Sequence, residues 1–245
     1  MTLTTSVPGV LEHVFLLEAG WQNVRCPADP VRATGFSIGL MGDKDRLVLA
    51  TAAHVFEGIP FVAAVNWRVA QYDRAGNVTR ECRFEMRGQT DFGCHRTYDL
   101  AWLRLPLMGT NGQPFAPPNE PLLPLAPVEI GFDAGTPVGW AGYPLQVERE
   151  LGRPTLCYYE GVVSACTDGE RMRYVVDGHA APGVSGGPVW TVVHRGDPLL
   201  VIGVVSSFGH DDTTQIPGFC LFEPINRLSA LLESQATSRT GEQGA

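Results

Sequence analysis

The sequence predicts an all-β protein built from two sets of strands. Of the 245 residues, 28 are glycine and 19 are proline, and they separate short segments rich in Val, Ile, Thr and aromatic side chains. Apolar residues make up 44% of the chain and charged residues 18%, so a sizeable core is expected. Seven prolines fall between Pro106 and Pro127, counting both. Because proline cannot donate to a sheet ladder, this stretch predicts an extended crossing segment.

Six strands are expected before the crossing segment, each a short run of β-branched, aromatic and other apolar residues. They are residues 14–17, 35–40, 46–51, 61–72, 78–87 and 100–105. Turn-forming residues, among them Asp and Gly, occupy 41–45 and 73–77. These two turns predict hairpins.

Six more strands are expected after the crossing segment, at residues 136–141, 155–164, 172–176, 188–193, 199–206 and 218–222. One helix is expected over 224–234, because its Ile and Leu residues recur at three- and four-residue spacings. Residues 236–245 are small and polar and predict a disordered tail. We therefore expect one domain over 1–235, with a first half at 10–106, a crossover at 107–130 and a second half at 131–222.

Charge argues against two classes of partner. The 18 basic and 26 acidic residues give a net charge of −8, which repels phosphate backbones and anionic membranes. The longest interior apolar run, residues 199–205, has seven residues, whereas a membrane-spanning helix needs about 20. We expect no nucleic-acid or membrane partner. The first basic residue is Arg25, and polar residues interrupt the apolar segment before it, so no cleaved secretory signal is expected.

The cysteines predict reduced, mostly buried thiols and a cytoplasmic location, because they are scattered over a chain long enough to fold without disulfides. Eleven residues separate Cys82 from Cys94, and eight separate Cys157 from Cys166. Zinc ligands usually come in closely spaced pairs. No metal or organic cofactor is therefore expected. The six cysteines are Cys26, Cys82, Cys94, Cys157, Cys166 and Cys220.

Three segments carry residues suited to catalysis. Thr51-Ala52-Ala53-His54 follows an expected strand, Asp99 precedes another, and Pro182-Gly183-Val184-Ser185-Gly186-Gly187-Pro188 is a glycine-rich turn. A serine hydroxyl needs a base within hydrogen-bond reach, and the ordinary pKa of histidine suits that proton transfer. A buried carboxylate on the other ring nitrogen fixes the tautomer and stabilises the imidazolium.

These roles fall to Ser185 as nucleophile, His54 as base and Asp99 as the orienting carboxylate. The backbone N–H groups of Gly183 and Ser185 would hold the oxyanion, each worth about 3 to 4 kcal/mol. Taken singly, each residue has a structural explanation, as a satisfied core histidine, a strand-start aspartate or an ordinary turn. Their order, each beside an expected strand, favours the triad. The other histidines are expected at surface or satisfied positions.

Through these motifs the chain resembles trypsin-like serine proteases of the chymotrypsin fold, over roughly residues 30–230. The stretch from Asp177 to Val189 is most similar to the catalytic domain of the HtrA-like group. The resemblance implies two antiparallel six-stranded β-barrels, with His54 and Asp99 from the first and Ser185 from the second. It also implies peptide-bond hydrolysis through an acyl-enzyme, with protein or peptide substrates. No residues are left for the PDZ peptide-binding domain of many HtrA-like relatives, so limited cleavage of specific intracellular targets is expected.

Two alternatives use the same residues. Gly183-Val184-Ser185-Gly186-Gly187 also fits the Gly-x-Ser-x-Gly elbow of α/β-hydrolase esterases, but that elbow requires a helix directly after the serine. Pro188 and the strand-like residues after it disfavour a helix. The second alternative is a protease fold kept as a catalytically silent binding scaffold.

The sequence departs from the family at positions that bear on regulation. Many secreted relatives have cysteines where this chain has Val55 and Ala181, and the resulting lack of two disulfides agrees with a reducing compartment. Relatives activated by cleavage carry an aspartate where this chain has Val184. We therefore expect activity without N-terminal cleavage, with any regulation through loop ordering or a partner protein. The charged loop at 143–159 is the candidate activation loop.

The resemblance also places a substrate pocket beside the serine. Its floor would be His179, followed by Ala180, and its walls would come from Ser207, Phe208 and Gly209 and from the segment around Gly218. Ser206 is the alternative to Ser207. A floor without a carboxylate disfavours cleavage after Arg or Lys. A histidine there favours an acidic or amide side chain, or a small apolar one.

Overall fold

The computed structural model gives the positions of most of the strands and of the three candidate catalytic segments, which carry His54, Asp99 and Ser185. The residues that it describes are 9–21, 31–40, 46–57, 65–86, 92–95, 97–110, 112, 115, 123–127, 131–167, 172–178, 180–192, 199–209 and 219–228. Within this part of the chain, no helix is both long enough and apolar enough to cross a membrane.

The first half is a curled antiparallel sheet of seven strands. In sheet order they are β5 (Val78–Met86), β4 (Val65–Tyr72), β1 (Val14–Trp21), β2 (Val31–Leu40), β3 (Arg46–Thr51), β7 (Ala101–Pro106) and β6 (Phe92–Cys94). The Asp73–Asn77 turn closes the β4–β5 hairpin: the Asp73 and Asn77 backbones are hydrogen-bonded, and Gly76 adopts a φ of 85°. The hairpin predicted there is confirmed, whereas the one at 41–45 lies outside the described residues.

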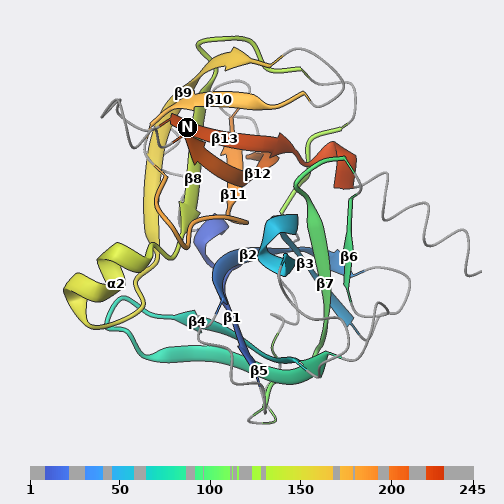
Figure 1. Ribbon diagram of the computed structural model, residues 1–245, viewed down its shortest axis with the longest axis vertical. Coiled ribbons are helices and arrows are strands. Elements are labelled where there is room, and N and C mark those ends of the chain that lie inside the picture. Colours follow the sequence, from blue (N-terminus) through green and yellow to red (C-terminus); the bar gives the residue numbers. More distant parts are fainter. Residues whose placement is uncertain are drawn as a thin grey trace, which may run out of the picture.

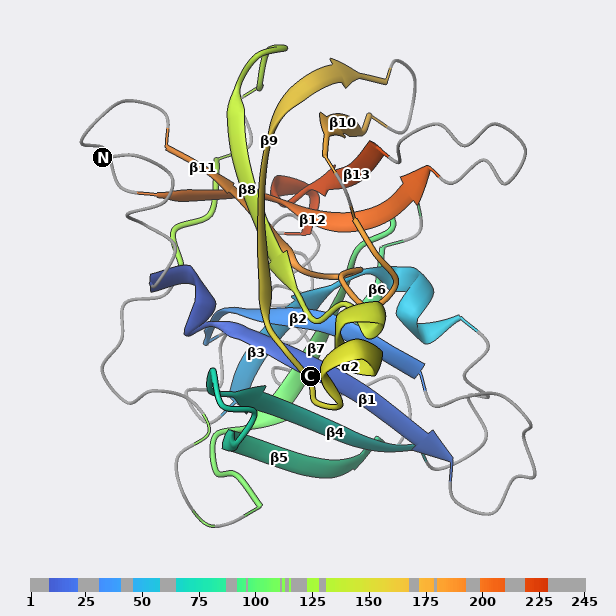
Figure 2. The same ribbon diagram turned by 90° about the vertical axis from the view of Figure 1, so that its left-hand side faces the viewer.

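The second half is a closed six-stranded barrel. Its order is β10 (Tyr174–Asp177), β13 (Phe219–Pro224), β12 (Leu200–Gly209), β11 (Pro188–Thr191), β8 (Pro137–Gly142) and β9 (Cys157–Cys166), which pairs with β10. Both views place this barrel above the curled sheet, with the two halves stacked end to end (Figure 1; Figure 2). The predicted all-β fold of the chymotrypsin type is confirmed, with a curled sheet in the position of the first barrel.

All twelve predicted strands are present, with ends shifted by a few residues, whereas the helical residues 9–11 and three short elements were not predicted. Strand β6 has three residues, η1 (Ala53–Phe56) is a single 3-10 turn, and α2 (Leu145–Leu151) lies in the loop expected to regulate the site. The boundaries of α2 nevertheless carry sequence signals typical of a helix. Pro144 precedes the helix, and Gly152 ends it in the left-handed region with a φ of 67°. Of the predicted C-terminal helix, residues 226–228 are helical, and the remainder with the tail lies outside the described residues.

Buried aromatic side chains fill both halves and the boundary between them. In the barrel, Trp140 stacks on Tyr159 with ring centroids 5.7 Å apart, and Trp190 stacks on Tyr158 at 5.6 Å. One apolar cluster joins residues of both halves, among them Phe36 and Trp102 from the sheet and many barrel residues. This shared core fixes the halves relative to each other.

Candidate active site

The His54 and Asp99 segments lie at the same end of one strand pair. Strand β3 pairs with β7 so that Thr51 is opposite Ala101. After β3 the chain passes through the extended residue Ala52, with φ −80° and ψ 145°, into the η1 turn that carries His54. Asp99 lies two residues before β7. The antiparallel register therefore places the two side chains side by side.

Two hydrogen bonds join His54 to Asp99. The His54 backbone N–H donates to Asp99 Oδ1 over 2.8 Å, and His54 Nδ1 lies 2.7 Å from Asp99 Oδ2. The His54 side chain is 38% exposed and the Asp99 side chain 12%, so a partly exposed imidazole is paired with a largely buried carboxylate. This contact raises the pKa of His54 above its ordinary 6.5, although burial opposes the rise. Burial favours protonation of Asp99, yet its hydrogen bonds from His54 and Ser206 keep its pKa below the ordinary value.

A third donor, Ser206, holds the same carboxylate from the barrel side. Ser206 is 1% exposed, and its Oγ donates to Asp99 Oδ2 over 2.7 Å. Behind it lies Glu223, a fully buried carboxylate whose Oε1 is 3.5 Å from Ser206 Oγ and 3.9 Å from Arg173 Nε. No local sequence signal indicates this role of Ser206, because the contact joins strand β12 to the start of β7 in the other half.

The serine turn, residues 182–188, packs against the Ser206 segment of β12 and against the segment that leads into His54. The Gly186 N–H donates to Val205 O over 2.7 Å, and Val205 directly precedes Ser206. A Cβ placed at Gly186 would lie 3.1 Å from Ala52 N, two residues before His54. The serine turn therefore lies against the backbone that precedes Ser206 and against the segment that leads into His54. No hydrogen bond joins the Ser185 hydroxyl to the His54 ring in this structure.

The backbone N–H groups of Gly183 and Ser185 meet no acceptor among the described residues, whereas the intervening Val184 N–H donates to Ala181 O over 3.0 Å. Gly183 and Gly186 adopt positive φ values of 95° and 87°, which glycine tolerates and other residues rarely adopt. Glycine is also needed for space at position 183, since a Cβ there would lie 2.3 Å from Tyr143 O. Two unengaged donors on one tight turn can bind an oxyanion.

The predicted substrate pocket remains a prediction. His179 and Gly218 lie outside the described residues, and Ala180 is partly buried. Ser207, Phe208 and Gly209 belong to β12, where they pair with β13, but only their backbones are described. The alternative wall residue, Ser206, directs its hydroxyl to Asp99.

The described residues contain no cluster of three or more His, Cys, Asp or Glu side chains close enough to hold a metal ion. Two other histidines have structural contacts. His13 is buried and lies 2.7 Å from Ser37 Oγ through its Nδ1, and His95 Nδ1 accepts from the backbone N–H of Thr97.

A family model for the trypsin-like peptidase domain matches residues 33–204, which is more than half of the chain. The chain belongs to the trypsin-like peptidase family. The match spans all three catalytic segments and ends within β12. The comparison with curated proteins gives no match. Membership makes this domain a serine peptidase by class, with protein substrates.

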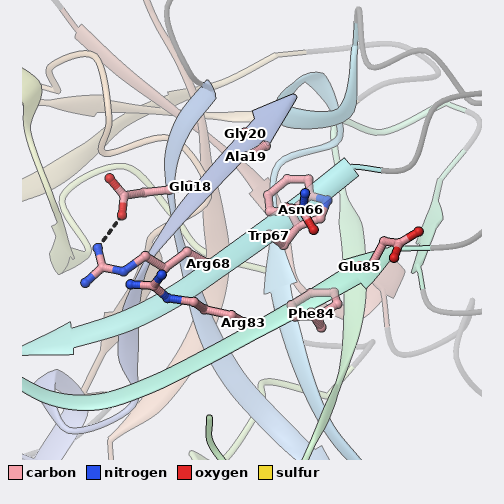
Figure 3. Close-up of a pocket in the computed structure, with 9 residues that line it drawn as sticks. All are labelled: Glu18, Ala19, Gly20, Asn66, Trp67, Arg68, Arg83, Phe84 and Glu85. Carbon is pink, nitrogen blue, oxygen red and sulfur yellow. Dashed lines mark hydrogen bonds and ion pairs between the residues drawn. The ribbon is translucent and has the colours of Figure 1, made fainter. Parts of the chain in front are cut away.

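A separate pocket lies on the first half of the peptidase domain, on strands β1, β4 and β5 (Figure 3). It has a volume of about 530 Å³ and contains none of the candidate triad residues. Its two guanidinium groups are already engaged, because Arg68 pairs with Glu18 and Glu81, and Arg83 pairs with Glu81 at 3.0 Å. We assign it no part in the chemistry. The lining residues are Glu18, Ala19, Gly20, Asn66, Trp67, Arg68, Arg83, Phe84 and Glu85.

Proposed function

We propose that this protein is a serine endopeptidase in which Ser185, His54 and Asp99 form the catalytic triad. The observation that carries the proposal is the double hydrogen bond from His54 to Asp99, at 2.8 and 2.7 Å, together with a serine turn on which two N–H groups meet no acceptor in the described part of the chain. A silent binding scaffold has no need of this combination. The half-exposed imidazole gives a substrate access to the reacting atoms.

The proposed reaction has two halves. Ser185 Oγ attacks the peptide carbonyl carbon while His54 Nε2 takes the hydroxyl proton, and the Gly183 and Ser185 N–H groups stabilise the oxyanion. The C–N bond then breaks, the amine leaves with the proton from His54, and an acyl-enzyme remains. Water gives its proton to His54 and attacks the ester carbonyl carbon. The bond to Ser185 Oγ then breaks, the acid is released, and His54 returns the proton to Oγ, which restores the serine. Asp99 keeps its charge throughout and fixes the ring so that Nε2 faces Ser185.

We also propose that cleavage is selective and limited to specific protein targets. The predicted pocket floor without a carboxylate supports a preference for residues other than Arg and Lys. A cleavage profile over a peptide library tests this preference, and dominant cleavage after Arg or Lys would contradict it.

A cytoplasmic location is a further proposal. It is supported by the free thiols of all five described cysteines. Two of them, Cys82 and Cys220, are buried, whereas Cys94 and Cys166 are exposed, which corrects the expectation of mostly buried thiols. Alkylation of the protein from its own cells, with and without prior reduction, tests it. Labelling of the same cysteines in both samples is expected, and labelling only after reduction would contradict it.

The proposed activity is tested with the purified chain and a library of peptides from a digested proteome, analysed for new N-termini by mass spectrometry. Wild type is expected to generate new termini and Ser185→Ala none. Ser164→Ala, at an exposed position on β9, serves as the matched control and is expected to match wild type. New termini from neither wild type nor control, with both folded, would favour the silent scaffold.

A further inference from the structure

Thr34, on strand β2 of the first half, contacts the serine turn through both its backbone and its side chain. It is fully buried. Its N–H donates to Ser185 O over 2.8 Å, its Oγ1 donates to Gly183 O over 2.7 Å, and the Tyr143 N–H donates to the same Oγ1 over 3.0 Å. Thr51 Oγ1 in turn donates to Thr34 O over 2.8 Å. One hydroxyl therefore ties β2 to two segments of the second half.

The surrounding glycines leave space for this residue. A Cβ at Gly142 would lie 2.8 Å from Thr34 Oγ1, and a Cβ at Gly186 would lie 2.0 Å from Thr34 O. Real Cβ atoms do not approach oxygen atoms so closely. The backbone of the second half is thus fitted around Thr34 at both points.

The hydrogen bonds around the turn fix the direction of the Gly183 N–H. In a trans peptide the C=O and the next N–H point in opposite directions, so an anchored carbonyl also aims the amide beyond it. Pro182 O accepts from the Leu145 N–H at the start of α2, over 2.8 Å, and this aims the Gly183 N–H. The next peptide unit is held at both ends, by Thr34 Oγ1 on Gly183 O and by Ala181 O on the Val184 N–H.

The Ser185 N–H is aimed in the same way. Val184 O accepts from the Gly187 N–H over 2.9 Å. The following unit is held by the Thr34 N–H on Ser185 O and by Val205 O on the Gly186 N–H. Four successive peptide units are therefore anchored, and Thr34, from the first half, anchors two of them.

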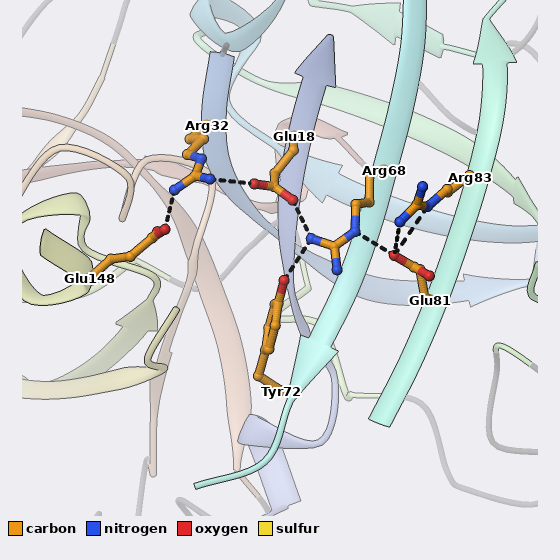
Figure 4. A network of polar contacts seen from close by, with 7 residues as sticks. All are labelled: Glu18, Arg32, Arg68, Tyr72, Glu81, Arg83 and Glu148. Atoms are coloured by element: carbon orange, nitrogen blue, oxygen red, sulfur yellow. Dashed lines mark hydrogen bonds and ion pairs between the residues drawn. The ribbon is translucent and has the colours of Figure 1, made fainter. Parts of the chain in front are cut away.

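Strand β2 also holds α2, the source of the Leu145 anchor. Arg32, two residues before Thr34, bonds Glu148 of α2 and also pairs with Glu18 at 2.8 Å. The chain of ion pairs continues from Glu18 through Arg68 to the outer strands (Figure 4). The same strand thus supports the turn directly through Thr34 and indirectly through α2.

We propose that the Thr34 hydroxyl is a positioning group that holds the oxyanion turn in its active shape, at a site where Val184 cannot form the ion pair used by cleavage-activated relatives. This inference rests on the proposed function. Loss of the hydroxyl leaves Gly183 O and the Tyr143 N–H without their partner. The peptide unit between Gly183 and Val184 can then rotate, which loosens the two adjoining peptide units that carry the Gly183 and Ser185 N–H groups.

The test compares Thr34→Val, which keeps the shape and loses the hydroxyl, with Thr34→Ser, which keeps the hydroxyl. Thr191→Val is the matched control, because Thr191 is equally buried and its Oγ1 donates to Pro137 O over the same 2.7 Å, on strand β11. We expect Thr34→Val to lower kcat by about 10- to 100-fold with KM little changed, since an oxyanion donor is worth about 10²- to 10³-fold. Thr34→Ser and Thr191→Val are expected within about threefold of wild type.

A second readout does not depend on turnover. Hydrogen–deuterium exchange of the peptide spanning 180–187 is expected to speed up in Thr34→Val and to stay at the wild-type rate in Thr191→Val. Full activity and unchanged exchange in folded Thr34→Val would overturn the inference while leaving the proposed function intact. A wild type that cleaves nothing and takes up no serine-directed label would overturn both.

Discussion

The change Asp99→Asn tests the triad through the three hydrogen bonds that the carboxylate accepts. Oδ1 accepts the His54 backbone N–H at 2.8 Å, and Oδ2 faces both His54 Nδ1 and Ser206 Oγ at 2.7 Å. An asparagine keeps one oxygen for the backbone N–H and places its NH2 group opposite Nδ1. Because that NH2 donates, the ring proton must move to Nε2, and the imidazole can no longer accept the proton of Ser185.

We expect kcat to fall by about 10⁴-fold, the size of effect that the wrong tautomer causes in a serine-histidine-aspartate triad. This corresponds to about 5.4 kcal/mol of activation free energy. The assay is initial-rate hydrolysis of the best peptide from the library, with melting temperatures to show that the variant is folded. Ser206→Ala is the matched control: it removes one donor and keeps the carboxylate, so a fall of only about tenfold is expected. Folded Asp99→Asn with activity within tenfold of wild type would refute the tautomer argument.

Three further changes probe the site and the core. The kcat/KM of wild type is expected to rise with pH through an inflection above 6.5, because Asp99 raises the pKa of His54 and only the neutral ring accepts a proton; an inflection below 6.5 would contradict this. The same shift stabilises the folded chain at pH values below the pKa of His54 in the unfolded state. That contribution is lost as the pH rises through the pKa of His54 in the folded state. Gly186→Ala is expected to abolish labelling of the serine, since its Cβ would lie 2.0 Å from Thr34 O; labelling at the wild-type rate would argue against the turn as described. Trp140→Ala, in the fully buried barrel core, is expected to lower the free energy of unfolding by about 3 to 5 kcal/mol in urea titrations. A loss under about 1 kcal/mol would contradict this and show that the neighbouring core side chains fill the space left by the indole ring.

Local sequence signals were sufficient for the strands and for the order of the catalytic segments. Strand 46–51 was predicted at its observed ends, because a turn bounds one side and the Ala-Ala-His segment the other. Strand β6 is too short, at three residues, to show a periodicity, and it depends on pairing with β7.

Residues whose roles arise only from tertiary contacts could not be found in this way. Thr34 and Ser206 are ordinary β-strand residues in the sequence. Their importance comes from contacts across the two halves, with partners 149 residues away for Thr34 Oγ1 and 107 residues away for Ser206. Only the register of β2 and β12 against the opposite half brings these hydroxyls to the site.

The most direct test of the account is the site of covalent modification by a fluorophosphonate, which reacts with an activated serine. The folded wild type, checked by circular dichroism, is treated with the probe, digested and mapped by mass spectrometry. We expect one label per chain, on Ser185, with no label in His54→Ala or in wild type denatured before treatment. An unlabelled folded wild type, or a label on another residue that persists in Ser185→Ala, would contradict it.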